Sequence, residues 1–267
     1  MNGIHYIMES DEETLRLEMK TKSAVIRKQA LWAGIKKGMR VADIGCGSGK
    51  TTSILYKLVQ PGGIVVGVDG SEKRIKYAKE HYAHHGIEFL CKDIREPFRN
   101  LELFDFVWVR FILEYYRSSS FDIVQNISKI VKPGGILCLI DLDHNSLNYF
   151  GLSQKLERTI LTVMKIIEES ANFDPYIGRK LYSYLYKLGY QNIDMQVTAH
   201  HLIFGELKKT DAFNWIKKIK TVSQKIHFKY DEYEGGYEEF FEEFERFLNN
   251  PGRFIYTPVI SSRGIKL

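Results

Sequence analysis

A glycine-rich loop between an apolar segment and a helical segment constrains this chain more than any other feature. The loop reads Asp43-Ile-Gly-Cys-Gly-Ser-Gly49 and follows a short apolar segment. It precedes residues 51–59, whose apolar side chains recur with helical spacing. Because glycine has no Cβ, such a loop lets the backbone approach a ligand at the N-terminus of a helix. We therefore expect an α/β fold that begins with a strand, a ligand-binding loop and a helix.

Two common nucleotide-binding motifs come close to this loop, and each differs from it by one residue. A P-loop, Gly-x-x-x-x-Gly-Lys-Ser/Thr, matches residues 49–51, but its first glycine would stand at Ile44. A dinucleotide fingerprint, Gly-x-Gly-x-x-Gly, would place its third glycine at Lys50. The pattern that fits is Asp-x-Gly-x-Gly-x-Gly. A P-loop protein that binds ATP with magnesium stays an alternative, against which Ile44 argues.

Apolar and helical segments alternate along the first half of the chain. Residues 71–81 and 121–131 are expected to be helices, and Ser71 can cap the first of them. Further strands are expected at 64–69, 87–91, 104–109 and 136–142. Five strands with intervening helices predict a Rossmann-like, doubly wound and mostly parallel sheet, with its ligand cleft at the carboxyl ends of the strands.

The pattern changes after residue 142. Long helices are predicted at 147–169 and 178–188, and strands near 193–197 and 201–204 bring the sheet to seven strands. Seven lysines then occupy 206–230, and eight acidic residues lie on an aromatic-rich, helical stretch at 231–247. We therefore divide the chain into one domain, 1–205, and a helical C-terminal extension, 206–267, that packs on the same domain.

Four further motifs follow the glycine loop in a fixed order. Asp69 ends the second strand, Asp93 follows the third, Arg-Phe-Ile-Leu-Glu at 110–114 follows the fourth, and Lys-Pro-Gly-Gly at 132–135 precedes the fifth. Together with the loop, these motifs resemble those of the class I S-adenosylmethionine-dependent methyltransferases over residues 38–142. The resemblance implies that the chain binds S-adenosylmethionine and releases S-adenosylhomocysteine. It further implies transfer of the methyl group to an oxygen, nitrogen or carbon nucleophile of a small molecule.

The resemblance also implies roles for individual residues. The Asp69 carboxylate would accept hydrogen bonds from both ribose hydroxyls, Asp93 would accept one from the adenine amino group, and Asp43 would orient the glycine loop. The family often has a histidine where this chain has Tyr115, so no histidine base is expected there. The other implied cofactor contacts are Gly45, Cys46, Gly47, Gly49, Gly70, Ile94, Arg110, Phe111 and Glu114.

Segments outside these motifs resemble the parts of small-molecule methyltransferases that select the substrate. The N-terminal segment, about 1–37, resembles a helical lid in which Tyr6 and Arg16 would cover the cofactor. The helices within about 147–188 stand where such enzymes carry a substrate cap. Aromatic residues that could line an acceptor pocket, or simply belong to the core, are Tyr149, Phe150, Phe173 and Tyr176.

Methyl transfer is an in-line displacement at a sulfonium carbon, so it needs alignment and exclusion of water rather than a metal or a strong acid. No metal site is predicted. A general base is optional, because some acceptors need no deprotonation. His144, directly after the fifth strand, is the candidate catalytic residue, and a solvated loop histidine is the open alternative.

Composition limits the partners and the compartment. A net charge of +5 over 267 residues is too small and too dispersed to indicate nucleic acid, and the acidic stretch 231–247 would repel phosphate. No apolar run reaches the roughly 18 residues of a membrane span. Cys46, Cys91 and Cys138 form no Cys-x-x-Cys pair. We therefore expect buried free thiols and a cytoplasmic protein without membrane contact.

Two alternatives to a small-molecule enzyme stay open, as does the choice between monomer and homodimer. One is methylation of RNA or protein, which predicts that the lysines of 208–229 form one exposed patch beside the cleft. The other is a non-catalytic S-adenosylmethionine-binding protein, which would lack a closed acceptor pocket.

Overall fold

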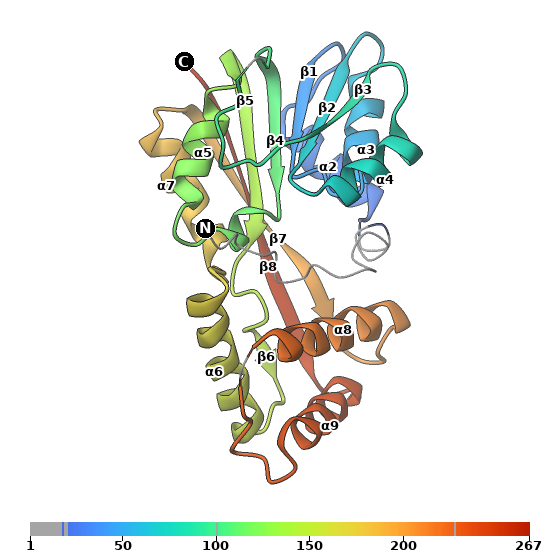
Figure 1. Cartoon of the computed structure of the whole chain (residues 1–267), viewed down its shortest axis with the longest axis vertical. Coiled ribbons are helices and arrows are strands. Elements are labelled where there is room, and N and C mark those ends of the chain that lie inside the picture. The colour runs from blue at the N-terminus through green and yellow to red at the C-terminus, as the bar shows by residue number, and fades with distance from the viewer. Residues whose placement is uncertain (1–17, 19–20, 100, 227) are drawn as a thin grey trace.

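Five parallel strands form one half of the central sheet in the computed structural model, which describes residue 18 and residues 21–99, 101–226 and 228–267 (Figure 1). The strands are β1 (Arg40–Ile44), β2 (Ile64–Asp69), β3 (Ile87–Cys91), β4 (Phe104–Arg110) and β5 (Val131–Leu142). They lie in the order β3-β2-β1-β4-β5. Because the order reverses between β1 and β4, a crevice for a ligand is expected at the carboxyl ends of these strands.

Alternate residues of β4 pack against helices on opposite faces of the sheet. On one face, Phe106 and Trp108 belong to a cluster with α2 (Ser23–Ala33) and α3 (Lys50–Val59). On the other face, Val107 and Val109 pack with helices that Figure 1 shows beside β5. Those helices are α5 (Ser120–Ser128) and α7 (Leu181–Lys187). A parallel sheet covered on both faces is expected to bury such consecutive apolar residues.

Helix α4 (Glu72–Tyr82) covers the edge strand β3 and begins at a serine cap. The Ser71 hydroxyl accepts a hydrogen bond from the backbone N–H of Arg74 (3.4 Å), which confirms the predicted cap. Ile75 and Ala78 pack with Phe89 of β3. Two residues, Gly70 and Ser71, separate the carboxyl end of β2 from the start of the helix.

The other half of the sheet is built around an antiparallel strand, β8 (Phe254–Ile265), which pairs with β5. Two further strands, β7 (Gln191–Ile203) and β6 (Tyr149–Phe150), pair antiparallel with β8. In the described part of the chain the sheet has eight strands. The predicted α/β fold with a mostly parallel sheet is confirmed, with one strand more than the seven expected.

A second hydrophobic cluster surrounds the far ends of β7 and β8 (Figure 1). It is formed by α6 (Gln154–Ser170), α8 (Lys209–Lys225) and α9 (Gly236–Asn249). Apolar residues recur on one face of each helix, as in α9, which buries Phe240, Phe244 and Phe247. This helical cluster lies beyond the carboxyl ends of the parallel strands.

Two boundaries predicted for this half are wrong. The residues predicted as two strands form the single strand β7, because a register shift between Ala199 and His201 lets the pairing continue. The helix predicted from residue 147 begins at Gln154, because residues 149–150 pair with β8 and the Ser153 hydroxyl caps the helix.

The prediction that 206–267 is a helical extension is wrong for its last part. Residues 254–265 form β8, which lies between β5 and β7 inside the sheet. Ile255, Thr257 and Val259 are buried while the residues before them are more exposed, as expected for a strand whose successive side chains point to opposite faces of the sheet. Pro258 is tolerated because it lies beside the register shift of β7.

The structure also tests the predictions of buried cysteines and of no membrane-spanning segment. Cys46 and Cys138 are buried free thiols, as predicted, but Cys91 is exposed because it ends the edge strand β3. Among the described residues, no helix combines the length and the apolar character that crossing a membrane requires.

Candidate functional site

The three glycines of the loop all have positive φ angles. The angle is +74° at Gly45, +55° at Gly47 and +89° at Gly49, a region that L side chains rarely adopt. A Cβ at Gly45 would lie 1.4 Å from Cδ1 of Ile112, and one at Gly49 would lie 2.8 Å from Cβ of Ala78. The turn from β1 into α3 therefore requires glycine for both its conformation and its packing.

Asp43 lies behind this loop, buried at the end of β1. Its Oδ2 accepts a hydrogen bond from Oγ1 of Thr52 (2.7 Å), which ties β1 to α3. Burial raises the pKa of Asp43 to about 7, although the hydrogen bond from Thr52 opposes the increase. The contact suits the orienting role that the resemblance implied.

Asp69 joins the glycine loop to the start of α4. Its Oδ2 accepts from the backbone N–H of Gly47 (3.0 Å). Its Oδ1 accepts from the N–H of Ser71 (2.9 Å) and from Nε of Arg74 (3.1 Å). The sequence analysis did not predict a role for Arg74. Its position could have indicated one, because it is a basic residue in the first turn of the helix that follows Asp69.

Asp93 and Arg95, after β3, form an ion pair. The backbone N–H of Arg95 donates to Oδ1 of Asp93 (2.9 Å). Nε of Arg95 lies 3.0 Å from each of the two carboxylate oxygens of Asp93 and donates to both. These side-chain hydrogen bonds lower the pKa of Asp93, against the effect of partial burial. Asp93 therefore stays a charged acceptor beside the buried Ile94.

Arg110, at the end of β4, is a half-buried cation. Its Nε donates to Oε1 of Gln29 in α2 (3.2 Å), and its guanidinium lies 3.8 Å from the centre of the Phe111 ring. Burial lowers the pKa of Arg110 to about 10, although the charges of Asp141 and Asp43 oppose the decrease. Phe111 has a φ of +59°, so the chain turns sharply where β4 ends.

Most of these residues line one cavity of about 350 Å³, here named the glycine-loop cavity. Its volume falls in the range of small-molecule sites, about 300–1,000 Å³. The predicted residues that line it are Gly45, Cys46, Gly47, Asp69, Gly70, Asp93, Ile94, Arg110, Phe111 and Glu114. Lining residues that the sequence analysis did not identify as contacts are Thr21, Ser48, Thr51, Ser71, Arg74, Arg95, Ile112, Tyr115 and Tyr116. Asp43 and Gly49 are not among the lining residues.

The chain before α2 reaches the glycine loop through Glu18. Its carboxylate accepts hydrogen bonds from Oγ of Ser48 (2.6 Å) and from the Tyr82 hydroxyl (2.9 Å). Glu18 therefore contacts Ser48, which lines the cavity. Tyr6 and Arg16, which were predicted to belong to the lid, lie outside the described residues.

A second cavity, here named the helical cavity, measures about 80 Å³ and lies among α6, α8, α9 and the end of β5. Its walls are mostly apolar and aromatic, and they include Tyr149 and Phe173 but neither Phe150 nor Tyr176. Glu114 and Tyr115, in the short 3₁₀ helix η1 (Leu113–Tyr115), line both cavities. The two cavities therefore adjoin at η1.

A chain of hydrogen bonds crosses the polar end of the helical cavity. Nζ of Lys218 donates to Oδ1 of Asn145 (2.9 Å) and to Oγ of Ser146. Nδ2 of Asn145 donates in turn to Oε2 of Glu114 (2.7 Å). Glu114, Asn145 and Ser146 are buried. Asn145 therefore links a cation on α8 to the carboxylate where the cavities meet.

Asp141, inside β5, holds η1 in place. Its Oδ2 accepts from the backbone N–H groups of Leu113 (2.9 Å) and Glu114 (3.3 Å). Burial, followed by the charge of Glu114, raises the pKa of Asp141 well above its ordinary value. The sequence signal that could have identified it is an aspartate within an apolar strand, since a buried carboxylate needs partners.

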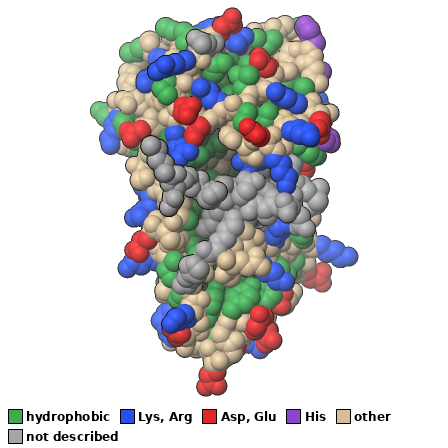
Figure 2. All heavy atoms as spheres, in the orientation of Figure 1, with side chains coloured by type: hydrophobic (Ala, Val, Ile, Leu, Met, Phe, Trp, Pro, Cys, Tyr) green, Lys and Arg blue, Asp and Glu red, His purple; other side chains and the backbone are tan. Residues whose placement is uncertain are grey.

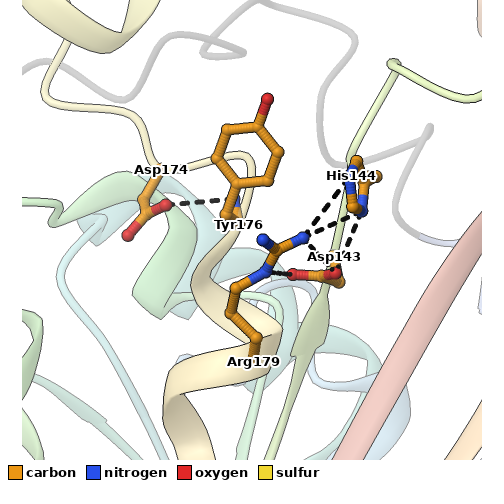
Figure 3. A network of polar contacts seen from close by, with 5 residues as sticks. All are labelled: Asp143, His144, Asp174, Tyr176 and Arg179. Carbon is orange, nitrogen blue, oxygen red and sulfur yellow. Dashed lines mark hydrogen bonds and ion pairs between the residues drawn. The ribbon is translucent and has the colours of Figure 1, made fainter.

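His144 belongs to a polar network at the end of β5, drawn in Figure 3. Arg179 donates two hydrogen bonds to Asp143, each 2.9 Å long, and Nδ1 of His144 lies 3.1 Å from Oδ2 of Asp143. The ring of Tyr176 packs edge-on against His144. The network fastens η2 (Ile177–Lys180) to β5. Since His144 lines neither cavity, this geometry does not support the catalytic role predicted for it.

One lysine of 208–229 points into a cavity instead of joining an exposed patch. Lys218 belongs to the helical cavity, and Nζ of Lys220 lies 4.9 Å from the ring centre of Phe241. Figure 2 shows basic and acidic side chains interspersed on the face that it draws. Across the described residues, no group of three or more histidine, cysteine, aspartate or glutamate side chains is arranged to hold a metal.

Comparison with known proteins agrees with this geometry. Among curated proteins, the ubiquinone biosynthesis O-methyltransferase of Coxiella burnetii (strain Dugway 5J108-111) is 33% identical over 111 residues, 41% of this chain and 46% of the relative. The demethylmenaquinone methyltransferase of Staphylococcus aureus (strain JH9) is 30% identical over 119 residues, 44% of this chain and 48% of the relative. The chain thus spans about half the length of the curated relatives it matches.

A solved structure shows that the fold extends over the rest of the chain. Phosphoethanolamine N-methyltransferase 2 of Haemonchus contortus superposes with a TM-score of 0.59 at 14% identity, over 100% of this chain and 60% of that chain. A family model described as "Methyltransferase domain" matches residues 35–187, more than half of the chain and all of the segment from β1 to η2. The chain therefore belongs to the methyltransferase domain family, among the class I S-adenosylmethionine-dependent methyltransferases.

Proposed function

We propose that the protein transfers a methyl group from S-adenosylmethionine in the glycine-loop cavity to a small molecule in the helical cavity. The observation that carries this proposal is that both cavities share Glu114 and Tyr115. In-line displacement needs the nucleophile and the methyl carbon to meet at about 3–3.5 Å, and adjoining cavities provide such a meeting point. A protein that only binds the cofactor has no need of a second cavity.

The residues of the glycine-loop cavity fit the adenosine part of the cofactor. A carboxylate offers about four acceptor sites, and Asp69 uses three of them for Gly47, Ser71 and Arg74. Accepting both ribose hydroxyls would therefore displace at least one of these bonds. Asp93, which hydrogen bonds from Arg95 keep ionised, would accept a hydrogen bond from the adenine amino group.

The opposite end of the glycine-loop cavity fits the methionine part. The guanidinium of Arg110 would pair with the carboxylate of the cofactor, because a cation partly withdrawn from water gains from an anionic partner. The Glu114 carboxylate would lie near the sulfonium charge at the junction of the cavities. When bound, the cofactor supplies the activated methyl group.

The relatives support a small organic acceptor and this cofactor. The printed names of the Coxiella and Staphylococcus proteins refer to methyl transfer in ubiquinone biosynthesis and to demethylmenaquinone. The Haemonchus structure contains S-adenosylhomocysteine. The inward position of Lys218 favours a small molecule over RNA or protein as the acceptor.

Calorimetric titration with S-adenosylhomocysteine tests the proposal, with ATP plus magnesium and NAD as controls. We expect micromolar binding of S-adenosylhomocysteine alone. Asp69→Asn should weaken it by about 1–3 kcal/mol, or roughly 5- to 150-fold, through altered ribose contacts. Asp122→Asn, on α5 and outside both cavities, is the matched control. Binding of only ATP or NAD would overturn the proposal, and an unchanged affinity in Asp69→Asn would remove Asp69 from the site.

A further inference from the structure

We infer that Glu114 accepts a proton from the methyl acceptor, and that this acceptor is an uncharged hydroxyl compound with an apolar body. The inference rests on the proposed function, since it takes the helical cavity as the acceptor site. It goes beyond that function by naming the substrate class and the group that removes the proton.

The walls of the helical cavity select the body of the acceptor. The aromatic walls include Phe173, Trp215 and Phe240, all buried. Aliphatic residues of α6 and α8 complete the walls: Ile160, Val163, Met164, Ile167, Ile219 and Val222. Such walls favour a flat apolar body, because it loses water on entry and contacts aromatic rings. The cavity measures about 80 Å³, which is below the roughly 300–1,000 Å³ of small-molecule sites, so the walls must move apart when the acceptor enters.

The charges at the polar end select the reacting group. Lys218 disfavours a cationic acceptor such as an ammonium, and Glu114 disfavours a carboxylate, because like charges repel strongly where water is excluded. A neutral hydroxyl satisfies both residues. It can donate its proton to Glu114, while the negative charge that develops on its oxygen is stabilised by Lys218.

Two buried polar atoms of the cavity-lining residues point independently to a ligand. Nε1 of Trp215 and Oδ1 of Asn214 have no hydrogen-bond partner among the described residues. An unsatisfied buried donor or acceptor is unfavourable and is expected where a ligand supplies the missing partner. We therefore expect the acceptor to carry a second polar substituent besides its reacting hydroxyl.

The chemical step follows from this placement. A lone pair of the hydroxyl oxygen attacks the methyl carbon, so a C–O bond forms as the S–CH₃ bond breaks. The electrons of the broken bond stay on sulfur and leave neutral S-adenosylhomocysteine. The hydroxyl proton moves to Glu114, and an uncharged methyl ether is released. Asn145 is a positioning residue, because its amide fixes Glu114 and accepts from Lys218.

Three probes of similar shape test the substrate class on protein saturated with S-adenosylhomocysteine. They are 4-nitrophenol, nitrobenzene and 4-nitrobenzylamine in its ammonium form. We expect 4-nitrophenol to bind at least about tenfold more tightly than either of the others, because only its hydroxyl suits both charges. Equal binding of the ammonium probe, or no binding of 4-nitrophenol, would overturn the inference.

The visible absorption of 4-nitrophenol also reports its ionisation, and two variants should shift its bound pKa in opposite directions. Lys218→Met should raise the pKa of the bound probe by about one pH unit, since a nearby cation is lost. Glu114→Gln should lower it by a similar amount, since a nearby anion is lost. Lys217→Met removes a neighbouring lysine of α8 that does not line the cavity, and it should cause no shift.

Lys218→Arg keeps the cation and should leave the pKa of the bound probe as it is in the wild-type protein. Shifts in the same direction for Lys218→Met and Glu114→Gln, or no shift in either, would refute the roles of the two residues. Each variant is also titrated with S-adenosylhomocysteine, which reports folding and cofactor binding separately. If the wild-type protein does not bind S-adenosylhomocysteine, the proposed function is refuted. Intact binding with unselective probe titrations would refute only this inference.

Discussion

The parallel half of the sheet and the helical cluster build their cavities in different ways. The glycine-loop cavity takes most of its residues from short segments that directly follow β1, β2, β3 and β4. The helical cavity combines η1 and the end of β5 with α6, α8 and α9, which lie far apart in the sequence. A site for a common cofactor can thus be encoded in local motifs, whereas the acceptor site depends on long-range packing.

The largest expected effect concerns the packing of the helical cluster. Phe244 of α9 is fully buried in it, and Phe244→Ala should lower the free energy of unfolding by about 3–5 kcal/mol. Urea denaturation measures this change, and binding of 4-nitrophenol should weaken more than binding of S-adenosylhomocysteine. Phe254→Ala, at an exposed position of β8, should have a much smaller effect. Equal weakening of both ligands by Phe244→Ala would contradict the separation of the two regions.

The glycine loop offers the next largest effect. Gly45→Ala places a Cβ against Ile112 at a positive φ, so it should weaken S-adenosylhomocysteine at least about 100-fold, or about 2.7 kcal/mol. Gly134 has a similar φ of +77° but nothing within 4 Å of its Cβ position. Gly134→Ala therefore carries the same backbone strain without the clash, and calorimetry should find its affinity unchanged. Similar losses in both variants would show that destabilisation of the fold, and not the change at the glycine loop, weakens binding.

Asp43 makes the free energy of unfolding of the protein depend on pH. Its pKa of about 7 in the folded protein lies above the ordinary value of 3.8, so folding favours the protonated form. This contribution is complete below about pH 4 and is lost as the pH rises through 7, by up to about 1.4 kcal/mol per pH unit. Asp43→Asn should remove that decline, as urea denaturation at pH 5 and pH 7 would show.

Asp105 serves as the control with the opposite sign. Partial burial opposes the shift, but hydrogen bonds from Lys132 and the Arg40 backbone lower the pKa of Asp105. Its stabilising effect is therefore present above the ordinary pKa and lost on acidification. A pH dependence of Asp43→Asn identical to that of the wild-type protein would contradict a protonated Asp43.

The smallest expected effect concerns His144, which belongs to neither cavity. His144→Ala should change the affinities for S-adenosylhomocysteine and 4-nitrophenol by less than about twofold, because its contacts are with Asp143, Tyr176 and Arg179. Calorimetry and absorption titrations measure both values. A loss of about tenfold in 4-nitrophenol affinity would return His144 to the acceptor site.

The difference between the regions also explains what the sequence could predict. Asp69, Asp93 and the glycines follow buried strands at short distances, so period and spacing alone place them at one edge of the sheet. The strand β8 was missed because its partners β5 and β7 lie far from it in the sequence, and pairing at that distance leaves no local motif. Its local signal was the run of aromatic and β-branched residues at 254–260, which favours a strand.

The acceptor side was predictable only in part, for the same reason. Tyr149 and Phe173 were identified as possible walls and line the helical cavity. Lys218 was grouped with the other lysines of 208–229. Nothing in the adjacent sequence distinguishes a lysine that faces a buried amide from one that faces water. Asn145 likewise gains its role only when α8 and η1 meet.

The central claim is that cofactor and acceptor meet at Glu114, and a crystal structure with S-adenosylhomocysteine and 4-nitrophenol tests it most directly. We expect the ribose hydroxyls on Asp69 and the phenol oxygen within hydrogen-bond distance of Glu114, facing the sulfur of the cofactor product. Binding of S-adenosylhomocysteine outside the glycine-loop cavity, or of the phenol away from Glu114, would contradict the account.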